Sequence, residues 1–260
     1  MLVDKDGDLK FDDSARKLTF RSEAGDNVGI RYDDITKVIF ERTGRMRGGV
    51  VAYLGLPGLI ASIQPVTEYW FYLEYKSGGH SEPLLFEVPK DSSEKVIAKA
   101  RDLFGARVTM PEFDEKAEEI NPKTLPDLKS KHTFTADKNN HPLPEVKAEK
   151  ATVVVVCPAL ETQYTGRGNQ FKLHANDHVI AVNREGTYSI AYLDPGKYKL
   201  VSQSENANGF EIQLQAGKEY YFLQNTFSGG MKWDIRLSRH SPELVMYELN
   251  GAYYSDWKRK

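Results

Sequence analysis

The chain of 260 residues contains one cysteine, Cys157, so disulfide bonds within the chain are excluded. This residue ends the run VVVVC, which predicts a buried strand thiol, and no basic neighbour favours a reactive thiolate. The chain also lacks an excess of charge of either sign, because its formal net charge is −2 and its pI is about 6.3. The chain has no excess of basic residues that would create a positive electrostatic field and attract nucleic acid, so no nucleic-acid partner is expected.

Long hydrophobic runs are scarce. The longest apolar, uncharged stretch covers residues 48–63, GGVVAYLGLPGLIASI. As a helix it would reach roughly 24 Å, short of the roughly 30 Å hydrocarbon core of a bilayer. Pro57 would also break that helix near its middle. A simple transmembrane span is therefore not expected.

Two interpretations of this apolar run remain open. In the first, residues 50–54 form a buried strand, 55–58 a turn, and 59–63 return to the core. In the second, the run is a loop whose tip enters a bilayer interface or the groove of a partner protein, with basic residues facing lipid phosphates. The candidate membrane or partner contacts are Arg45, Arg47, Tyr53, Leu54, Leu56, Leu59 and Ile60.

Recognisable catalytic and metal-binding patterns are missing as well. The sequence has no glycine-rich phosphate loop and no G-x-S-x-G elbow. His174 and His178 are close in HANDH, but the intervening Asn176 and Asp177 predict a turn between two strands, hence a surface hairpin. We expect no catalytic residue, no cofactor and no metal site.

What the sequence does contain is alternation of apolar and polar residues, typical of β-strands. In the first zone, residues 7 to about 108, we predict strands at 8–11, 17–21, 28–32, 37–41, 68–75 and 84–88. From Asp91 onward the apolar residues follow helical spacing, with a capping box formed by Asp91 and Glu94, and Gly105 ends this helix.

Residues 109–150 differ from both flanking zones. They are rich in Lys, Glu, Asp and Pro, which predicts a polar linker with one short helix at 113–120. After it, strands are predicted at 152–156, 178–182, 186–193, 197–202, 210–214, 219–225 and 232–237, which favours an antiparallel β-sandwich. A final helix is predicted at 242–249, with Ser241 as its N-cap.

The first zone resembles bacterial pleckstrin-homology-like domains of the GRAM-like kind. The resemblance covers roughly residues 7–108 of a domain predicted at 1–108 and depends on GDLKF, KLTF, IRYDDITKVIFE, FYLEYKSGG and LLFEVPK. It implies a split barrel plugged by a C-terminal helix, and a binding role. Members that bind phosphoinositides carry basic residues in the first hairpin loop, whereas the turn here begins with Asp12 and Asp13, so phosphoinositide binding is not expected.

The last zone, the domain predicted at 151–260, is similar over about residues 150–248 to an uncharacterised β-sandwich family found in bacterial envelope lipoproteins. The resemblance depends on the segments ATVV, NREGTY, LDPGKY and LQAGKEYY. The resemblance implies a location in the bacterial envelope, and it implies no catalytic activity. The first residues of the chain lack the features of a secretory signal, which predicts a cytoplasmic location, or the periplasmic side of the envelope if an upstream signal has been removed.

The mainly β, two-domain chain is therefore predicted to be a non-enzymatic binding or scaffolding protein, peripheral to a membrane or envelope through the apolar run. Its partner would be a protein or a membrane surface. The alternatives are a hydrolase or transferase with a site at the domain junction, and a carbohydrate-binding module. A sugar platform would use Tyr188, Tyr192, Tyr198 and Trp233, although core packing also explains these residues.

Overall fold

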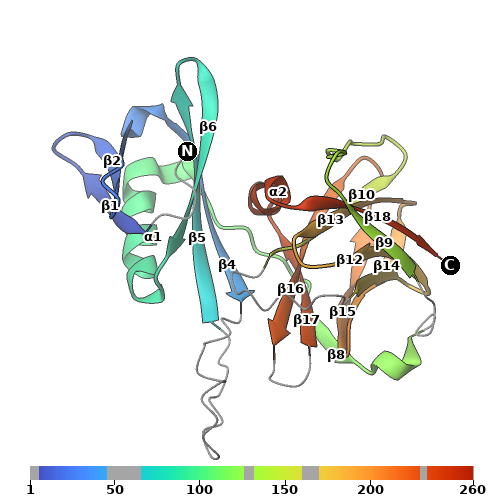
Figure 1. Cartoon of the computed structure of the whole chain (residues 1–260). Helices are drawn as coiled ribbons and strands as arrows, with labels where there is room; N and C mark the ends of the chain where they lie inside the picture. Colours follow the sequence, from blue (N-terminus) through green and yellow to red (C-terminus); the bar gives the residue numbers. More distant parts are fainter. Residues whose placement is uncertain (1–5, 46–65, 126–131, 160–169, 229–232, 260) are drawn as a thin grey trace, which may run out of the picture. The chain divides into compact units, whose positions relative to one another are not determined.

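The fold is seen in a computed structural model of the chain, which describes residues 6–45, 66–125, 132–159, 170–228 and 233–259. Most of these residues lie in β-strands, as the alternating pattern predicts (Figure 1). The chain divides into two compact units. The first comprises residues up to Thr43 together with Glu68–Pro111, and the second includes everything from Glu112 onward.

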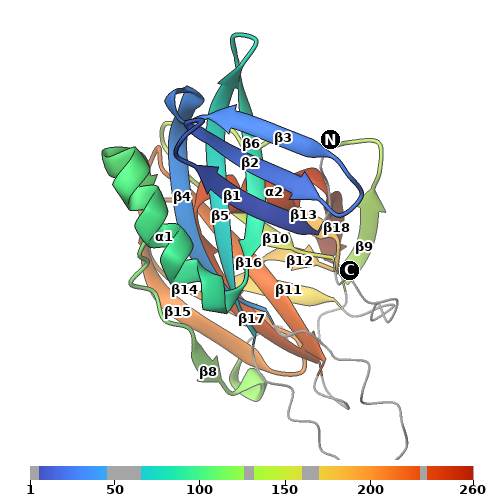
Figure 2. The same ribbon diagram turned by 90° about the vertical axis from the view of Figure 1, so that its left-hand side faces the viewer.

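The N-terminal unit contains two sheets and one long helix, α1. The smaller sheet has the order β1 (Gly7–Asp12), β2 (Lys17–Ser22) and β3 (Asn27–Arg31). The larger has the order β6 (His80–Val88), β5 (Val66–Ser77), β4 (Ile35–Arg45) and β7 (Val108–Thr109). Figure 2 shows the strands of the smaller sheet crossing those of the larger. Every strand predicted for this zone is present, and the described strands form no closed barrel.

Helix α1 (Lys90–Phe104) completes this unit because its buried face joins the core between the sheets. Ala100 and Phe104 pack in one cluster with residues of both sheets, among them Leu18 and Phe71. Gly105, at φ 53°, ends the helix as predicted. The predicted capping box is wrong, because the N-cap is Pro89, two residues before Asp91, and it makes no side-chain hydrogen bond.

The C-terminal unit contains a six-stranded and a five-stranded sheet. The six-stranded order is β17 (Trp233–His240), β16 (Glu219–Ser228), β10 (Ala151–Cys157), β13 (Thr187–Leu193), β18 (Tyr253–Arg259) and β9 (His132–Asp137). The five-stranded order is β12 (His178–Asn183), β11 (Phe171–Ala175), β14 (Gly196–Gln203), β15 (Ala207–Leu214) and β8 (Glu118–Ile120).

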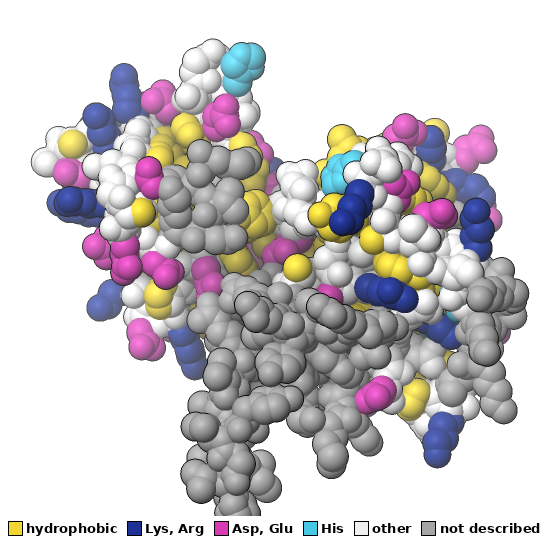
Figure 3. All heavy atoms as spheres, in the orientation of Figure 1, with side chains coloured by type: hydrophobic (Ala, Val, Ile, Leu, Met, Phe, Trp, Pro, Cys, Tyr) yellow, Lys and Arg dark blue, Asp and Glu magenta, His cyan; other side chains and the backbone are white. Residues whose placement is uncertain are grey.

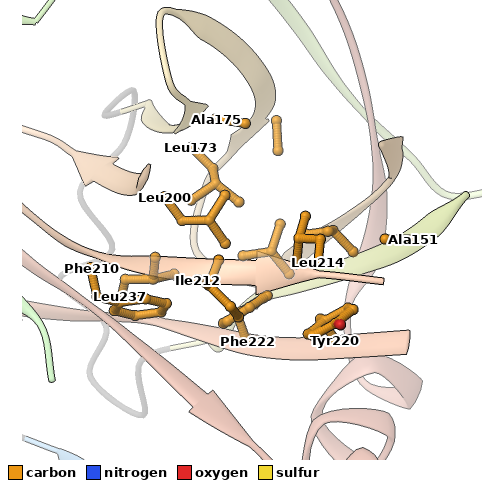
Figure 4. Close-up of a cluster of buried hydrophobic side chains, with 13 residues drawn as sticks. Ala151, Leu173, Ala175, Leu200, Phe210, Ile212, Leu214, Tyr220, Phe222 and Leu237 are labelled. Atoms are coloured by element: carbon orange, nitrogen blue, oxygen red, sulfur yellow. The ribbon is translucent and has the colours of Figure 1, made fainter. Parts of the chain in front are cut away.

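Side chains of both sheets meet in one apolar core, shown in Figure 4. Strand β10 is buried along its whole length. Ala151, Val153 and Val155 face the core, so Val154 and Val156 point to the opposite face of the sheet. Helix α2 (Pro242–Asn250) packs against β10 and β16 (Figure 1). Both faces of β10 are therefore buried, which explains why its valines are continuous instead of alternating with polar residues.

Helix α2 begins as the sequence predicts. The Ser241 side chain accepts a hydrogen bond from the backbone N–H of Leu244, and Pro242 occupies the first turn. The prediction of a purely antiparallel sheet is wrong, because β10 pairs with β16 and β13 pairs with β18 in parallel. The α2 crossover after β17 returns the chain so that β18 runs in the same direction as β13.

The segment 109–150 also differs from the predicted linker. Strand β8 replaces the helix expected at 113–120 and pairs with β15, where Ile120 lies opposite Ala207. Strand β9 pairs with β18 along its whole length. Residues from Glu112 onward therefore belong to the C-terminal unit, because long-range strand pairing compensates for their polar composition.

Candidate functional site

The predicted membrane or partner contacts fall almost entirely outside the described residues. Arg45 is the last residue of β4. Arg47, Tyr53, Leu54, Leu56, Leu59 and Ile60 lie in the range 46–65, which the structure does not describe. No helix within the described ranges is long and apolar enough to cross a membrane. The contact at residues 48–63 therefore stays a prediction from sequence.

The two neighbouring histidines lie on the predicted hairpin. Strands β11 and β12 pair across the turn, in which Asn176 adopts φ 53°. His174 is buried, with Nε2 2.8 Å from Oε1 of Gln203, whereas His178 is exposed. Among the described residues there is no group of three or more His, Cys, Asp or Glu that could hold a metal ion.

The tyrosines of the predicted sugar platform do not all lie on one face. Tyr188 and Tyr192 lie on β13, and the Tyr254 ring is 5.5 Å from the Tyr188 ring. Tyr198, by contrast, packs against the core between the sheets. Trp233 is the first residue of β17. The outer face of the six-stranded sheet thus carries a different set of tyrosines from the predicted one.

Residues 138–147, here called the strap, lie against that outer face. The strap starts at a turn in which Oδ1 of Asp137 accepts hydrogen bonds from the backbone N–H groups of Asn139 and Asn140. The Tyr188 hydroxyl then donates to the carbonyl of Pro142 at 2.9 Å. Further on, Oγ1 of Thr152 donates to the carbonyl of Glu145 at 2.8 Å. Two side chains of the six-stranded sheet therefore hold the strap by hydrogen bonds to the carbonyls of Pro142 and Glu145.

Three apolar or aromatic side chains on and beside the strap remain in solvent. Leu143 is 57% exposed, Val146 59% and Tyr192 39%. Nζ of Lys147, the residue after Val146, lies 5.5 Å from the centre of the Tyr192 ring. We call these three residues the strap patch. In Figure 3, hydrophobic and charged side chains are interspersed over the part of the molecule where Figure 1 places β10, β13 and β18.

Two lysines near the strap patch are in ion pairs. Lys147 forms an ion pair with Glu145, which raises the pKa of Lys147 and lowers that of Glu145. Nζ of Lys150 lies 2.7 Å from Oδ1 of Asp194, and this contact raises the pKa of Lys150. These two ion pairs lie beside the exposed apolar side chains of the strap.

A second feature of this unit is a groove of about 370 Å³ between the segment before β8 and strand β17. Nη1 of Arg239 lies 2.5 Å from Oε1 of Glu115, and its guanidinium is 5.0 Å from the rings of Phe113 and Tyr220. Oε2 of Glu115 is buried without a hydrogen-bond partner in the part of the chain described.

Asparagine side chains close the other wall of the groove. Oδ1 of Asn206 accepts from the N–H of Ile235, and Oδ1 of Asn208 accepts from the N–H of Leu237, both at 2.8 Å. The Nδ2 groups of both asparagines donate to the carbonyl of Ile235. These bonds join Asn208 on β15, and Asn206 just before it, to the outer edge of β17 in the other sheet.

A network of uncharged polar side chains lies in the interior. Asn183 donates to Gln224 at 2.9 Å, and Gln224 donates to Ser202 at 2.8 Å. Ser189 donates to Oδ1 of Asn183 at 2.7 Å. All four residues are buried and come from both sheets, so the network connects the two layers.

The sequence analysis missed the strap because its composition resembles a linker. The signal available in the sequence was HPLPEV, residues 141–146, in which two prolines flank Leu143 and Val146 follows, within an otherwise polar segment. Comparisons with protein-family models, with curated proteins and with solved structures gave no match to this chain.

Proposed function

We propose that the protein is a non-enzymatic binding or scaffolding protein that contacts a protein partner through the strap patch. The observation that carries the proposal is the exposure of Leu143 and Val146 on a segment whose carbonyls are bonded to the sheet. Exposed apolar side chains on a segment that is bonded to a sheet are typical of protein interaction surfaces.

The proposed architecture has two binding folds, a PH-like domain followed by a β-sandwich. In the N-terminal unit, two sheets and a closing helix around one core support the PH-like part. In the C-terminal unit, the core shared by the two sheets supports the sandwich. Attachment to a membrane or envelope through residues 48–63 is a separate part of the proposal and depends on the sequence alone.

Photo-crosslinking in cells of the native source tests the protein contact. A crosslinking amino acid at position 146 should capture one predominant protein, and the same group at the exposed Met110 of the other unit should not. The captured protein is then purified and titrated with Leu143→Ser and Val146→Ser, each expected to weaken binding at least about tenfold. Equal capture at positions 146 and 110, or unchanged affinity in both variants, would contradict the proposal.

A further inference from the structure

We propose that Arg184 is a binding site for a carboxylate group, carried by a small molecule or by a polypeptide. This inference goes beyond the proposed function, because Arg184 belongs neither to the strap patch nor to the apolar run. It depends on three observations, namely the fixed backbone at Arg184, the surroundings of its guanidinium, and the counterion that this group lacks among the described residues.

The backbone at Arg184 is held by one buried threonine. Arg184 follows β12 and lies in the turn that leads into β13. Its backbone N–H donates to Oγ1 of Thr187 at 2.9 Å, and the same hydroxyl donates to the Arg184 carbonyl at 2.8 Å. Thr187 is 2% exposed, and the N–H of Gly186 in the same turn donates to the carbonyl of Cys157. The turn therefore fixes the point from which the Arg184 side chain starts.

The guanidinium lies against an aromatic ring of the other sheet. Strand β9 is next to β12, although the two strands belong to different sheets. Cζ of Arg184 lies 4.5 Å from the centre of the Phe134 ring on β9, so the ring covers one face of the planar group. Nε is buried without a hydrogen-bond partner in the part of the chain described, and the residue as a whole is half-buried. Nη1 and Nη2 therefore form the edge that a ligand can reach.

This guanidinium has no counterion among the residues that the structure describes. Arg16 and Arg239 are each paired with a carboxylate, whereas no described acidic side chain forms an ion pair with Arg184. The adjacent Glu185 accepts a hydrogen bond from Thr226 instead. A charge that is partly removed from water costs free energy unless an opposite charge compensates for it. A bound anion would supply that compensation.

The chemistry of the site favours a carboxylate over a phosphate. Nη1 and Nη2 form a fork that matches the two oxygens of a carboxylate, and one guanidinium balances its single negative charge. A phosphate group carries nearly two negative charges at pH 7. Because the residue next to Arg184 is itself acidic, Glu185, the second charge would not be compensated.

Titration of the full chain, followed by the NMR signal of the Arg184 Nε–H group, tests the inference. Sodium acetate should shift this signal saturably, with a Kd in the millimolar range. Sodium phosphate should bind at least about threefold more weakly, and sodium chloride at equal ionic strength should give no saturable change. The peptide acetyl-Ala-Glu-Ala-amide distinguishes the two sources. Binding at least about tenfold tighter than acetate assigns the site to a polypeptide, and equal or weaker binding assigns it to a small molecule.

Arg184→Lys keeps the positive charge and removes the fork, so acetate should no longer shift the backbone N–H signals of Gly186 and Thr187 saturably. Arg21→Gln, at an exposed arginine of the other unit, is the matched control and should leave acetate binding unchanged. Thermal midpoints check the folding of both variants, and the comparison of acetate with phosphate and chloride uses the unaltered chain. Absence of a saturable acetate shift, tighter binding of phosphate, or acetate binding retained by Arg184→Lys overturns the inference.

Discussion

Arg239 and Glu115 form an ion pair of 2.5 Å although 124 positions separate them in the sequence. The Arg239 side chain is also within cation–π distance of Phe113 and Tyr220. The pair connects β17 to the segment that leads into β8. It therefore contributes to holding residues 112–120 on the C-terminal unit.

We expect Glu115→Ala to destabilise the C-terminal unit by about 1–3 kcal/mol, because the partly buried Arg239 loses its counterion. Urea unfolding measures the change. Limited proteolysis should also cut the segment before β8 faster in this variant.

The matched control is Glu211→Ala, which removes an exposed ion pair with Lys197. Glu211 is 65% exposed, so solvent already screens the pair and its removal should leave the unfolding midpoint unchanged. Equal effects of the two substitutions would show that the Arg239–Glu115 contact does not hold the segment.

Asn208→Ala should destabilise the C-terminal unit by about 2–3 kcal/mol, because it leaves the buried N–H of Leu237 without its acceptor. Denaturant unfolding monitored by tryptophan fluorescence measures the loss. Gln213→Ala, on the same strand but exposed, should change stability by less than about 0.5 kcal/mol. A stable Asn208→Ala protein would indicate that water replaces the asparagine side chain.

Stability should decline in alkali because the phenol of Tyr188 is held protonated by the fold. Burial raises the pKa of Tyr188 from 10.0 to about 12. The unfolded chain loses this proton first, so the stabilising contribution is complete below pH 10 and is lost as pH rises toward 12. Tyr188→Phe should make the decline of urea midpoints over this range shallower. Tyr253→Phe, at an exposed tyrosine, should leave the slope as it is.

The apolar run is tested by Leu56→Ser combined with Leu59→Ser. If the run is a membrane-seeking or partner-seeking loop, liposome or partner binding should be lost while the melting temperature stays nearly the same. If the run belongs to the core, the substitutions should cost several kcal/mol of stability instead. A large fall in melting temperature would therefore rule out the loop interpretation.

Local patterns predicted much of the fold. Period-two alternation identified the strands of the N-terminal unit, and Ser241 with Pro242 identified the start of α2. At α1, Pro89 precedes the helix and shifts its start, so the apparent capping box at Asp91 lies inside the first turn. Local spacing could not reveal this shift.

Local sequence patterns could not predict which strands, distant in the sequence, pair with each other. The parallel partners of β10 and β13 are set by connections through other elements, and nothing within those strands encodes them. Strands β8 and β9 are short or polar, and they form because β15 and β18 offer edges to them. The strap was hidden for the same reason, since its anchors, Tyr188 and Thr152, lie downstream in other strands.

The asparagine side chains at the start of β15 have a consequence for how this protein behaves at high concentration. Strand β17 ends the six-stranded sheet, and such an end strand normally presents unpaired backbone groups to which another molecule can add a strand. Asn206 and Asn208 already occupy the N–H and carbonyl of Ile235 and the N–H of Leu237. These three groups are not available to a second molecule, so this part of the β17 edge is protected against ordered aggregation.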